Sequence, residues 1–334
     1  MVADGPSAGD VGGFADRSRR PPASPRRTAD GIEQRILAAR AEHPAWGARK
    51  IRAVLERAGQ ARPACSTVHQ VLKRHGLILP EPGGEPARLR FEAAAPNDLW
   101  QMDFKGHSRL GDGSRLHPLT VVDDHSRYAP CLKALGGETG EEVKAALTQV
   151  FAVHGLPPRI FTDNGTPWGG SQGNCWTRFR VWLLKLGVDL IHSRPYHPQS
   201  RGKNERFHRS MDEEVLSLRP LATRADAQKA FDHWRLVYNH QRPHEALGLA
   251  VPASRYRPSI RPMPSKPAQP HYEDGTLTRK VPATKSDISF QGRHWKVPEA
   301  FCGERLAIRP LAQDGQFGVF FASHQIASID LTDQ

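Results

Sequence analysis

Hydrophobic residues recur at a helical period between residues 31 and 78 of this 334-residue chain. Apolar side chains three or four positions apart predict three helices in this region. Residues that disfavour helix continuation end them at His43-Pro44, Gly59 and Gly76. We expect Ser66 to cap the third helix, because its hydroxyl can accept a hydrogen bond from a backbone N–H that the helix leaves unpaired.

The outer face of the third predicted helix is polar and basic. Gln70, Lys73 and Arg74 lie opposite the apolar positions of that helix. Two helices joined by a short turn, with such side chains exposed on the second, are typical of a helix-turn-helix module that reads the major groove of DNA. A small helical bundle that packs on the rest of the chain without contacting DNA is the alternative.

The hydrophobic period changes to two near residue 99, and it then switches repeatedly between strand and helix. Gly111-Asp112-Gly113 predicts a tight hairpin turn, and Thr139 with Glu142 predicts a capping box. Further helices are expected at residues 179–186, from about residue 201, and at residues 218–240. The pattern predicts an α+β domain, a mixed sheet covered by helices. Its expected strands are residues 99–104, 116–122, 128–135, 159–163 and 188–192.

The end of the chain has a third character. From residue 271, short apolar runs are separated by Gly, Pro and Asp, a pattern typical of a small β-barrel. Segments rich in Pro, Gly and Ala separate the periodic regions and predict linkers or disorder. The expected units are a disordered Arg/Pro-rich segment 1–30, a helix-turn-helix domain 31–78, a linker 79–96, a core 97–258, a Pro-rich linker 259–270 and a barrel 271–334.

Charge changes the picture because it is uneven. The net charge is +12, and residues 31–91 and 251–310 each carry 11 Lys and Arg against 5 Asp and Glu. Two basic flanks around a nearly neutral middle favour a polyanionic partner such as DNA. The four cysteines show no paired spacing, which argues against a disulfide scaffold or a zinc–cysteine site. With no apolar run of bilayer length and no signal peptide, a cytoplasmic protein is expected.

Three acidic residues stand at the ends of predicted elements. Asp103 closes a strand on its polar face, Asp163 closes another before Asn164-Gly165, and Glu205 lies in the first turn of a helix. Carboxylates brought to one point repel each other unless cations lie between them. Oxygen ligands suit Mg²⁺, and two such ions can serve phosphoryl transfer.

Each acid also has an ordinary explanation. Asp103 could cap a turn, Asp-Asn-Gly is good turn chemistry, and Glu205 alone could be a solvated charge. The sequence around Glu205 favours the functional interpretation, because five basic residues near it are placed to hold phosphates. They are Arg194, Arg201, Lys203, Arg206 and Arg209.

Five blocks occur in an order that resembles a known family. They are residues 97–103 (Asn-Asp-Leu-Trp-Gln-Met-Asp), 121–128, 161–165 (Phe-Thr-Asp-Asn-Gly), 194–206 and 238–244. With them, the chain resembles bacterial insertion-sequence transposases that share their catalytic core with retroviral integrases. The resemblance covers about residues 30 to 260. It implies a ribonuclease H-like fold with a mixed five-stranded sheet.

The resemblance also implies a mechanism. Asp103 would bridge two Mg²⁺ ions, which Mn²⁺ can replace, with Asp163 on one ion and Glu205 on the other. The enzyme would cleave the 3′ end of a mobile element and join it to target DNA, as a homo-oligomer on double-stranded DNA in the bacterial nucleoid. Asp123 would play a supporting role. Trp100 and Trp168 are candidates for stacking on bases, although a tryptophan at the position of Trp100 more often belongs to the core. The residues expected to contact DNA at this site are Asn164, His197, Gln199, Lys203, Asn204, Arg206 and Arg209.

The chain departs from the family at its N-terminus. Related transposases usually carry a further helix-turn-helix module before an Arg/Pro-rich linker, and nearly nothing precedes the linker here. A catalytically silent, truncated or domesticated DNA-binding remnant is therefore the alternative hypothesis. A ribonuclease or structure-specific nuclease on the same fold is a third, but it leaves both basic flanks unexplained.

Overall fold

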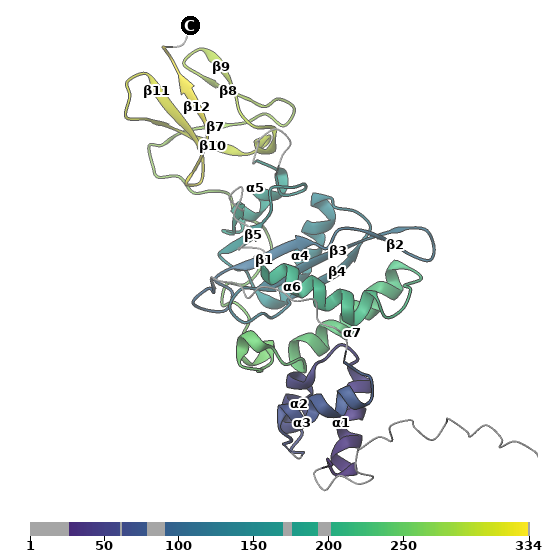
Figure 1. Ribbon diagram of the computed structural model, residues 1–334. Coiled ribbons are helices and arrows are strands. Elements are labelled where there is room, and N and C mark those ends of the chain that lie inside the picture. The colour runs from purple at the N-terminus through teal and green to yellow at the C-terminus, as the bar shows by residue number, and fades with distance from the viewer. Residues whose placement is uncertain (1–26, 61, 79–90, 170–175, 193–201, 333–334) are drawn as a thin grey trace, which may run out of the picture.

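The computed structural model describes residues 27–60, 62–78, 91–169, 176–192 and 202–332. Figure 1 shows three units in a row, with a helical module at one end, a mixed α/β core in the middle and a β module at the other end. The order of units agrees with the sequence prediction. No helix within the described ranges is long and apolar enough to cross a membrane.

The N-terminal module consists of three helices around a small apolar core. The core includes Trp46, which is 1% exposed and stacks on His43. The predicted cap of the third helix is wrong, because this helix begins at Cys65 and its N-cap residue is Ala64, with no side-chain cap bond. Ser66 therefore lies inside the first turn. The helices are α1 (Asp30–Glu42), α2 (Ala48–Arg57) and α3 (Cys65–Arg74).

The core sheet is mixed, and its one parallel region positions the site. β1 pairs with β3 antiparallel and with β5 parallel, and β5 pairs with β6 parallel. β4 pairs with the other side of β3, and the short β2 extends a hairpin with β3. The predicted five strands are thus confirmed, with β2 as an addition. Their bounds are β1 (Trp100–Phe104), β2 (Ser108–Arg109), β3 (Arg115–Asp123), β4 (Cys131–Leu135), β5 (Arg159–Thr162) and β6 (Asp189–His192).

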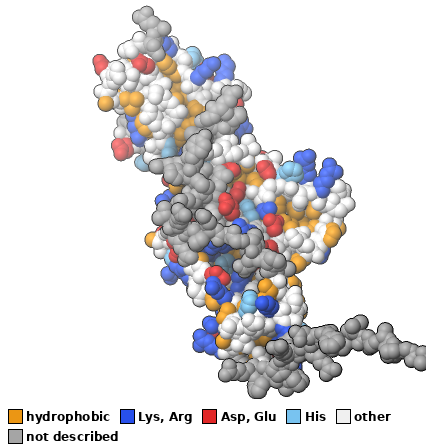
Figure 2. Space-filling model, in the orientation of Figure 1, with side chains coloured by type: hydrophobic (Ala, Val, Ile, Leu, Met, Phe, Trp, Pro, Cys, Tyr) orange, Lys and Arg blue, Asp and Glu red, His pale blue; other side chains and the backbone are white. Residues whose placement is uncertain are grey.

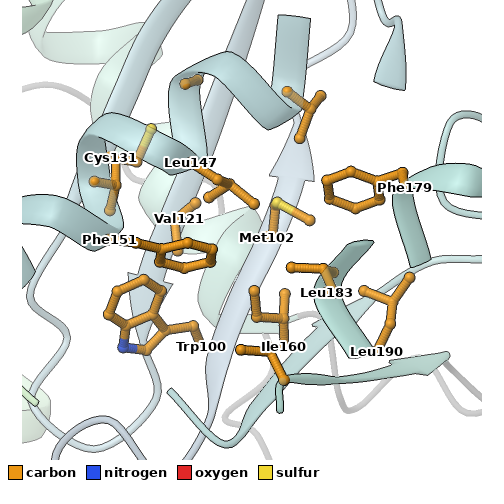
Figure 3. Close-up of a cluster of buried hydrophobic side chains, with 14 of the residues drawn as sticks. Trp100, Met102, Val121, Cys131, Leu147, Phe151, Ile160, Phe179, Leu183 and Leu190 are labelled. Atoms are coloured by element: carbon orange, nitrogen blue, oxygen red, sulfur yellow. The ribbon is translucent and has the colours of Figure 1, made fainter. Parts of the chain in front are cut away.

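Helices cover both faces of this sheet. α4 (Gly140–His154) and α5 (Arg178–Lys185) pack on the face that carries Trp100 and Met102, the cluster drawn in Figure 3. α6 (Gly202–Met211), the π-helical turn η4 (Asp212–Leu216) and α7 (Arg224–His240) pack on the other side against β3 and β4. The Thr139 capping box is confirmed, since its side chain accepts from the Glu142 N–H.

The C-terminal module is an antiparallel sheet and not the closed barrel that the sequence predicted. Its strands follow the order β12-β11-β10-β7, and β8 pairs only with β9 in a separate hairpin among the described residues. Short strands of four residues in β7, β8 and β9 leave little length for closing a barrel. The strands are β7 (Leu277–Lys280), β8 (Asp287–Phe290), β9 (Arg293–Lys296), β10 (Arg305–Pro310), β11 (Gln316–Phe321) and β12 (His324–Asp330).

The three units are joined by direct contacts. Arg57 of α2 donates to the carbonyl oxygens of Gln241 and Leu249, which follow α7. At the other junction, Lys185 of α5 forms an ion pair with Glu304 at 2.8 Å. The core extends into both predicted linkers, because Arg261 donates to the Leu186 carbonyl and the Ala93 N–H donates to Asp124.

Candidate active site at the carboxyl ends of β1 and β5

Asp103 is half-buried near the end of β1, on the polar face of the strand. Trp100 and Met102 point into the apolar cluster, so the alternation of the strand places Gln101 and Asp103 on the opposite face. Thr120 of β3 is the cross-strand partner of Asp103, and its hydroxyl donates to the Asp103 carbonyl oxygen at 2.9 Å. The backbone at Asp103 is therefore fixed from the neighbouring strand.

Asp163 follows β5, which runs parallel to β1. The register pairs Gln101 with Phe161, so Asp103 and Asp163 each stand two residues further along neighbouring strands. Parallel strands end at the same edge of a sheet, so the backbone brings both aspartates to that edge. The Asp163 carboxylate accepts from the Gly165 N–H at 3.0 Å, and the ring of His192 contacts the Asp163 carbonyl at 2.8 Å. Asp163 thus organises its own turn while it stands at this edge.

Glu205 is exposed in the first turn of α6, and its position on the helix points it toward the same edge. Glu205, His208 and Asp212 are spaced i, i+3 and i+7, so they share one side of the helix as it continues into η4. His208 Nε2 lies 2.9 Å from the hydroxyl of Thr120, and Asp212 forms an ion pair with Lys105 at 3.0 Å. The side of α6 that carries Glu205 therefore faces the end of β1.

The distance along α6 between His208 and Asp212 matches the distance along the chain between the two sites that they contact. His208 contacts Thr120, the cross-strand partner of Asp103, and Asp212 pairs with Lys105, the residue that follows β1 and lies two positions after Asp103. Four residues of helix rise about 6 Å and two residues of strand rise about 7 Å. Helix α6 thus runs alongside β1 in the same direction at this point.

A buried ion pair holds the beginning of α6. Lys203 Nζ contacts the carboxylate of Asp124, which is 0% exposed and also accepts from the Gln101 side chain at 2.6 Å. Burial lowers the pKa of Lys203 from its ordinary value, and the hydrogen bond to Asp124 acts in the opposite direction. Sequence reasoning missed this pair, although Asp-Asp at the end of a buried strand is a signal for buried charge that needs a partner.

The three carboxylates do not form a complete metal group here. Within the parts of the chain that the structure describes, no three His, Cys, Asp or Glu side chains form a group that could hold a metal ion. The structure brings Asp103 and Asp163 to one edge and lays α6 beside it. The site that Glu205 would complete stays a prediction.

Comparisons with known proteins agree with this architecture. Two models described as integrase core domain match residues 93–198 and 186–252, which include all three carboxylates. A model described as the C-terminal domain of IS481 family transposases matches residues 276–334, and a homeodomain-like model matches residues 7–72. The chain contains an integrase core domain and is similar to transposases of the insertion-sequence type.

The similarity to individual proteins is low. The chain is 29% identical over 236 residues to an uncharacterized protein of insertion element IS407 from Burkholderia multivorans, covering 66% of this chain and 80% of that one. It is 31% identical over 172 residues to an IS476 protein from Xanthomonas euvesicatoria, covering 52% of this chain and 47% of that one. Among solved structures, it is similar to a chain of a simian T-cell lymphotropic virus intasome, with a TM-score of 0.44, 16% identity and coverage of 87% and 95%.

The residues that the sequence assigned to DNA contact at this site separate into two groups. Asn164, Arg206 and Arg209 are exposed. Asn204 is 4% exposed and Lys203 is held by Asp124, so neither presents a side chain to DNA in this structure. His197 and Gln199 lie outside the described residues.

The prediction that Trp100 and Trp168 stack on bases is wrong. Trp100 is 0% exposed and Trp168 is 1% exposed, and Trp168 stacks on Phe104 within the apolar cluster. Both indole rings contribute to the packing of the apolar cluster on this face of the sheet.

Asp123 has the contacts of a supporting residue. It is fully buried, and its carboxylate accepts from the backbone N–H of Asn97 and from the N–H and hydroxyl of Ser126. Burial raises the pKa of Asp123 against these hydrogen bonds. It ties the entry of β1 to the turn after β3 and does not face the edge where Asp103 lies.

In the helical module, Gln70 and Lys73 are exposed on α3. Arg74 instead forms an ion pair with Glu33 of α1 at 2.6 Å, and His75 contacts the other oxygen of Glu33 at 2.7 Å. Of the three predicted base-reading residues, Arg74 therefore has a structural partner within its own module.

Proposed function

We propose that this transposase cleaves a phosphodiester bond at each end of its element and joins the freed 3′-hydroxyl to target DNA. Asp103, Asp163 and Glu205 carry the reaction. The observation that carries the proposal is the parallel pairing of β1 with β5, which brings two aspartates of an integrase core to one sheet edge.

The donor set suits Mg²⁺. Asp103 and Asp163 are half-buried, Glu205 is exposed, and all three offer hard carboxylate oxygens. We propose that they hold two Mg²⁺ ions, replaceable by Mn²⁺. Such ions, when bound, stabilise charge on the attacking and leaving oxygens of an in-line displacement.

The chain itself supplies position. Thr120 and His208 fix the backbone of β1 and the side of α6 that bears Glu205, so little motion is needed at the moment of reaction. His208 is neutral at physiological pH, since burial lowers its pKa to about 4. It acts as a hydrogen-bond donor to Thr120 because the Thr120 proton is directed to Asp103.

The partner is double-stranded DNA, bound by a homo-oligomer that pairs two element ends. The net charge of +12 and the exposed Gln70 and Lys73 on a homeodomain-like module support DNA binding. Asn164, Arg206 and Arg209 are exposed and are proposed to contact the DNA at the site.

A strand-transfer assay tests the assignment. Oligonucleotide element ends are incubated with wild type and with Asp103→Asn, Asp163→Asn and Glu205→Gln, in Mg²⁺ or Mn²⁺. We expect all three variants to lose cleavage and joining while they still bind DNA. The matched control is Asp232→Asn, which removes an exposed carboxylate on α7 and leaves activity intact. Equal activity in all variants would exclude the carboxylate assignment, and an inactive wild type that still binds DNA would favour the silent remnant.

A further inference from the structure

A basic groove lies next to Asp103, on the side where β1 runs out of the sheet. It is a cavity of about 280 Å³ between the β1–β2 turn and the segment that follows η4. One wall is residues 105–110, the other is Leu216 with residues 219–221, and Pro118 and Asp212 also line the cavity. Lys105, His107, Arg109 and Arg219 line it, and the one acidic lining residue is Asp212.

The two walls are fixed to each other. The backbone N–H groups of Gly111 and Asp112 donate to the carbonyl oxygens of Leu221 and Ala222, each at 2.9 Å. Behind them, Leu110 and Leu221 are buried in the same apolar cluster. A Cβ at residue 111 would stand 3.2 Å from the Cα of Ala222, so the close contact of the walls depends on glycine. The groove is therefore preformed.

The β2–β3 hairpin concentrates positive charge with little internal compensation. Arg109 and Arg115 are direct cross-strand partners, so their side chains leave the same face of the hairpin. Both are exposed, and neither guanidinium forms an ion pair with another of the residues that the structure describes. Like charges directly opposite each other destabilise a strand pair. Figure 2 shows Lys and Arg side chains gathered at this outer end of the core, where Figure 1 places β2.

Lys105 and Arg219, which also line the groove, are already paired with carboxylates. Lys105 pairs with Asp212, and its side chain is 26% exposed. Arg219 pairs with Asp226, and its side chain is 55% exposed. Surface ion pairs of this kind contribute little stability, so a phosphate can share or replace the carboxylate at small cost.

We propose that this groove binds the phosphate backbone of DNA beside the phosphodiester that reacts. The proposal rests on the function proposed for Asp103. Lys105 directly follows β1, about 7 Å beyond Asp103 at the rise of an extended chain. One DNA strand advances about 3.4 Å per nucleotide. The groove therefore begins about two nucleotides from the reacting bond, and Arg109 and Arg115 contact phosphates further out.

Binding, and not activity, tests the groove. Fluorescence anisotropy of the full chain with a labelled element-end duplex is measured over a range of salt concentrations. The proteins are wild type, Arg109→Gln, Arg115→Gln, the double variant, and the control Lys144→Gln on α4, which covers the opposite face of the sheet. Each lost phosphate contact should reduce the slope of log K against log salt by about 0.9. We expect a reduction of about 2 for the double variant, and no change for the control.

A photo-crosslinker at Ser108 then locates the DNA. This exposed residue of β2 should crosslink nucleotides within about one helical turn of the reacting phosphate, a distance expected from the hairpin's length. An unchanged salt slope in the double variant, or crosslinks confined to distant DNA, would contradict the proposal that this groove binds DNA. Asp103→Asn separates the two proposals, because it should lose joining and keep the wild-type slope. If Asp103→Asn stays active while the arginine double variant loses slope, the catalytic assignment fails and the groove stands.

Discussion

The two ends of the polar face of β1 use the same residue types for opposite purposes. At Gln101, the carboxylate of Asp124 is fully buried and held by Lys203. Two residues further along β1, Asp103 is half-buried. Glu205, which lies on α6 like Lys203, is exposed. Lys203 and Glu205 are themselves only two residues apart in α6. One end is closed and charge-compensated, and the other is open to solvent.

The difference shows how burial divides labour among charged residues. A buried ion pair needs its partner at all times, because desolvation makes a lone charge expensive. Such a pair can fix the beginning of α6 against β1. A carboxylate that remains accessible can instead bind ions or substrate. The closed end thus positions the open end, and four predictions separate their roles.

The largest effect is expected at the open end. Glu205→Gln should reduce strand transfer by more than about 10³-fold, the scale of losing one preorganised electrostatic group. Because Glu205 is exposed, the free energy of unfolding should not change. Urea denaturation and single-turnover joining are measured on the same preparation. A variant that loses activity and stability together would place Glu205 with the closed end.

The closed end should show the reverse pattern. Asp124→Asn or Lys203→Met leaves a buried charge unpaired and should cost about 3–5 kcal/mol in unfolding free energy. The double variant should recover part of that loss, because no lone charge remains. Lys105→Met is the comparison, since it breaks the half-exposed pair with Asp212 and should cost less than about 1 kcal/mol. Equal losses for Lys203→Met and Lys105→Met would contradict the distinction.

His208 joins the two ends and should make stability depend on pH. Burial lowers its pKa to about 4 in the folded chain, against 6.5 for an unperturbed imidazole. Between these values the unfolded chain binds a proton that the folded chain does not. The contribution of neutral His208 to the free energy of unfolding is therefore fully present above pH 6.5. It is lost as the pH drops toward 4, by up to about 3 kcal/mol.

The variant His208→Gln isolates this contribution, since glutamine can still donate to Thr120 and does not titrate. Burial also lowers the pKa of His154, to about 4, so the wild-type curve contains more than one histidine. The difference in unfolding free energy between wild type and His208→Gln is therefore the quantity to follow from pH 7 to pH 4. A difference that does not vary with pH would show that His208 is not the titrating group.

The sequence predicted the periodic elements well because their signals are local. The alternation that places Asp103 opposite Trp100 and Met102 is confirmed, as is the cap at Thr139. The roles of Lys203 and Asn204 could not be read in this way. Their neighbours in the sequence suggested a basic DNA-contacting turn, whereas Lys203 is held by Asp124, nearly 80 residues away, and Asn204 is buried. Contacts of that separation leave no local pattern.

The C-terminal module shows a second limit. Turn residues between short strands were correct, but strand pairing depends on which edges meet, and β8 and β9 pair with each other apart from the main sheet. Similarly, Trp168 follows a turn and looked available for stacking on bases. Its burial depends on Phe104 and Phe179, which approach it from other elements.

The smallest expected effect extends the comparison to α3. Lys73 is exposed, whereas its neighbour Arg74 is held by Glu33. Lys73→Gln should weaken binding to all DNA sequences alike and reduce the salt slope by about 1, as expected for one phosphate contact. Arg74→Gln should leave the slope unchanged and destabilise the helical module, because it removes a partner of a buried carboxylate. Anisotropy with element-end and unrelated duplexes measures the first effect, and urea denaturation measures the second. If Arg74→Gln reduced the slope as much as Lys73→Gln, the pairing with Glu33 would not keep Arg74 from DNA, and the separation of closed from open charges would not hold in this module.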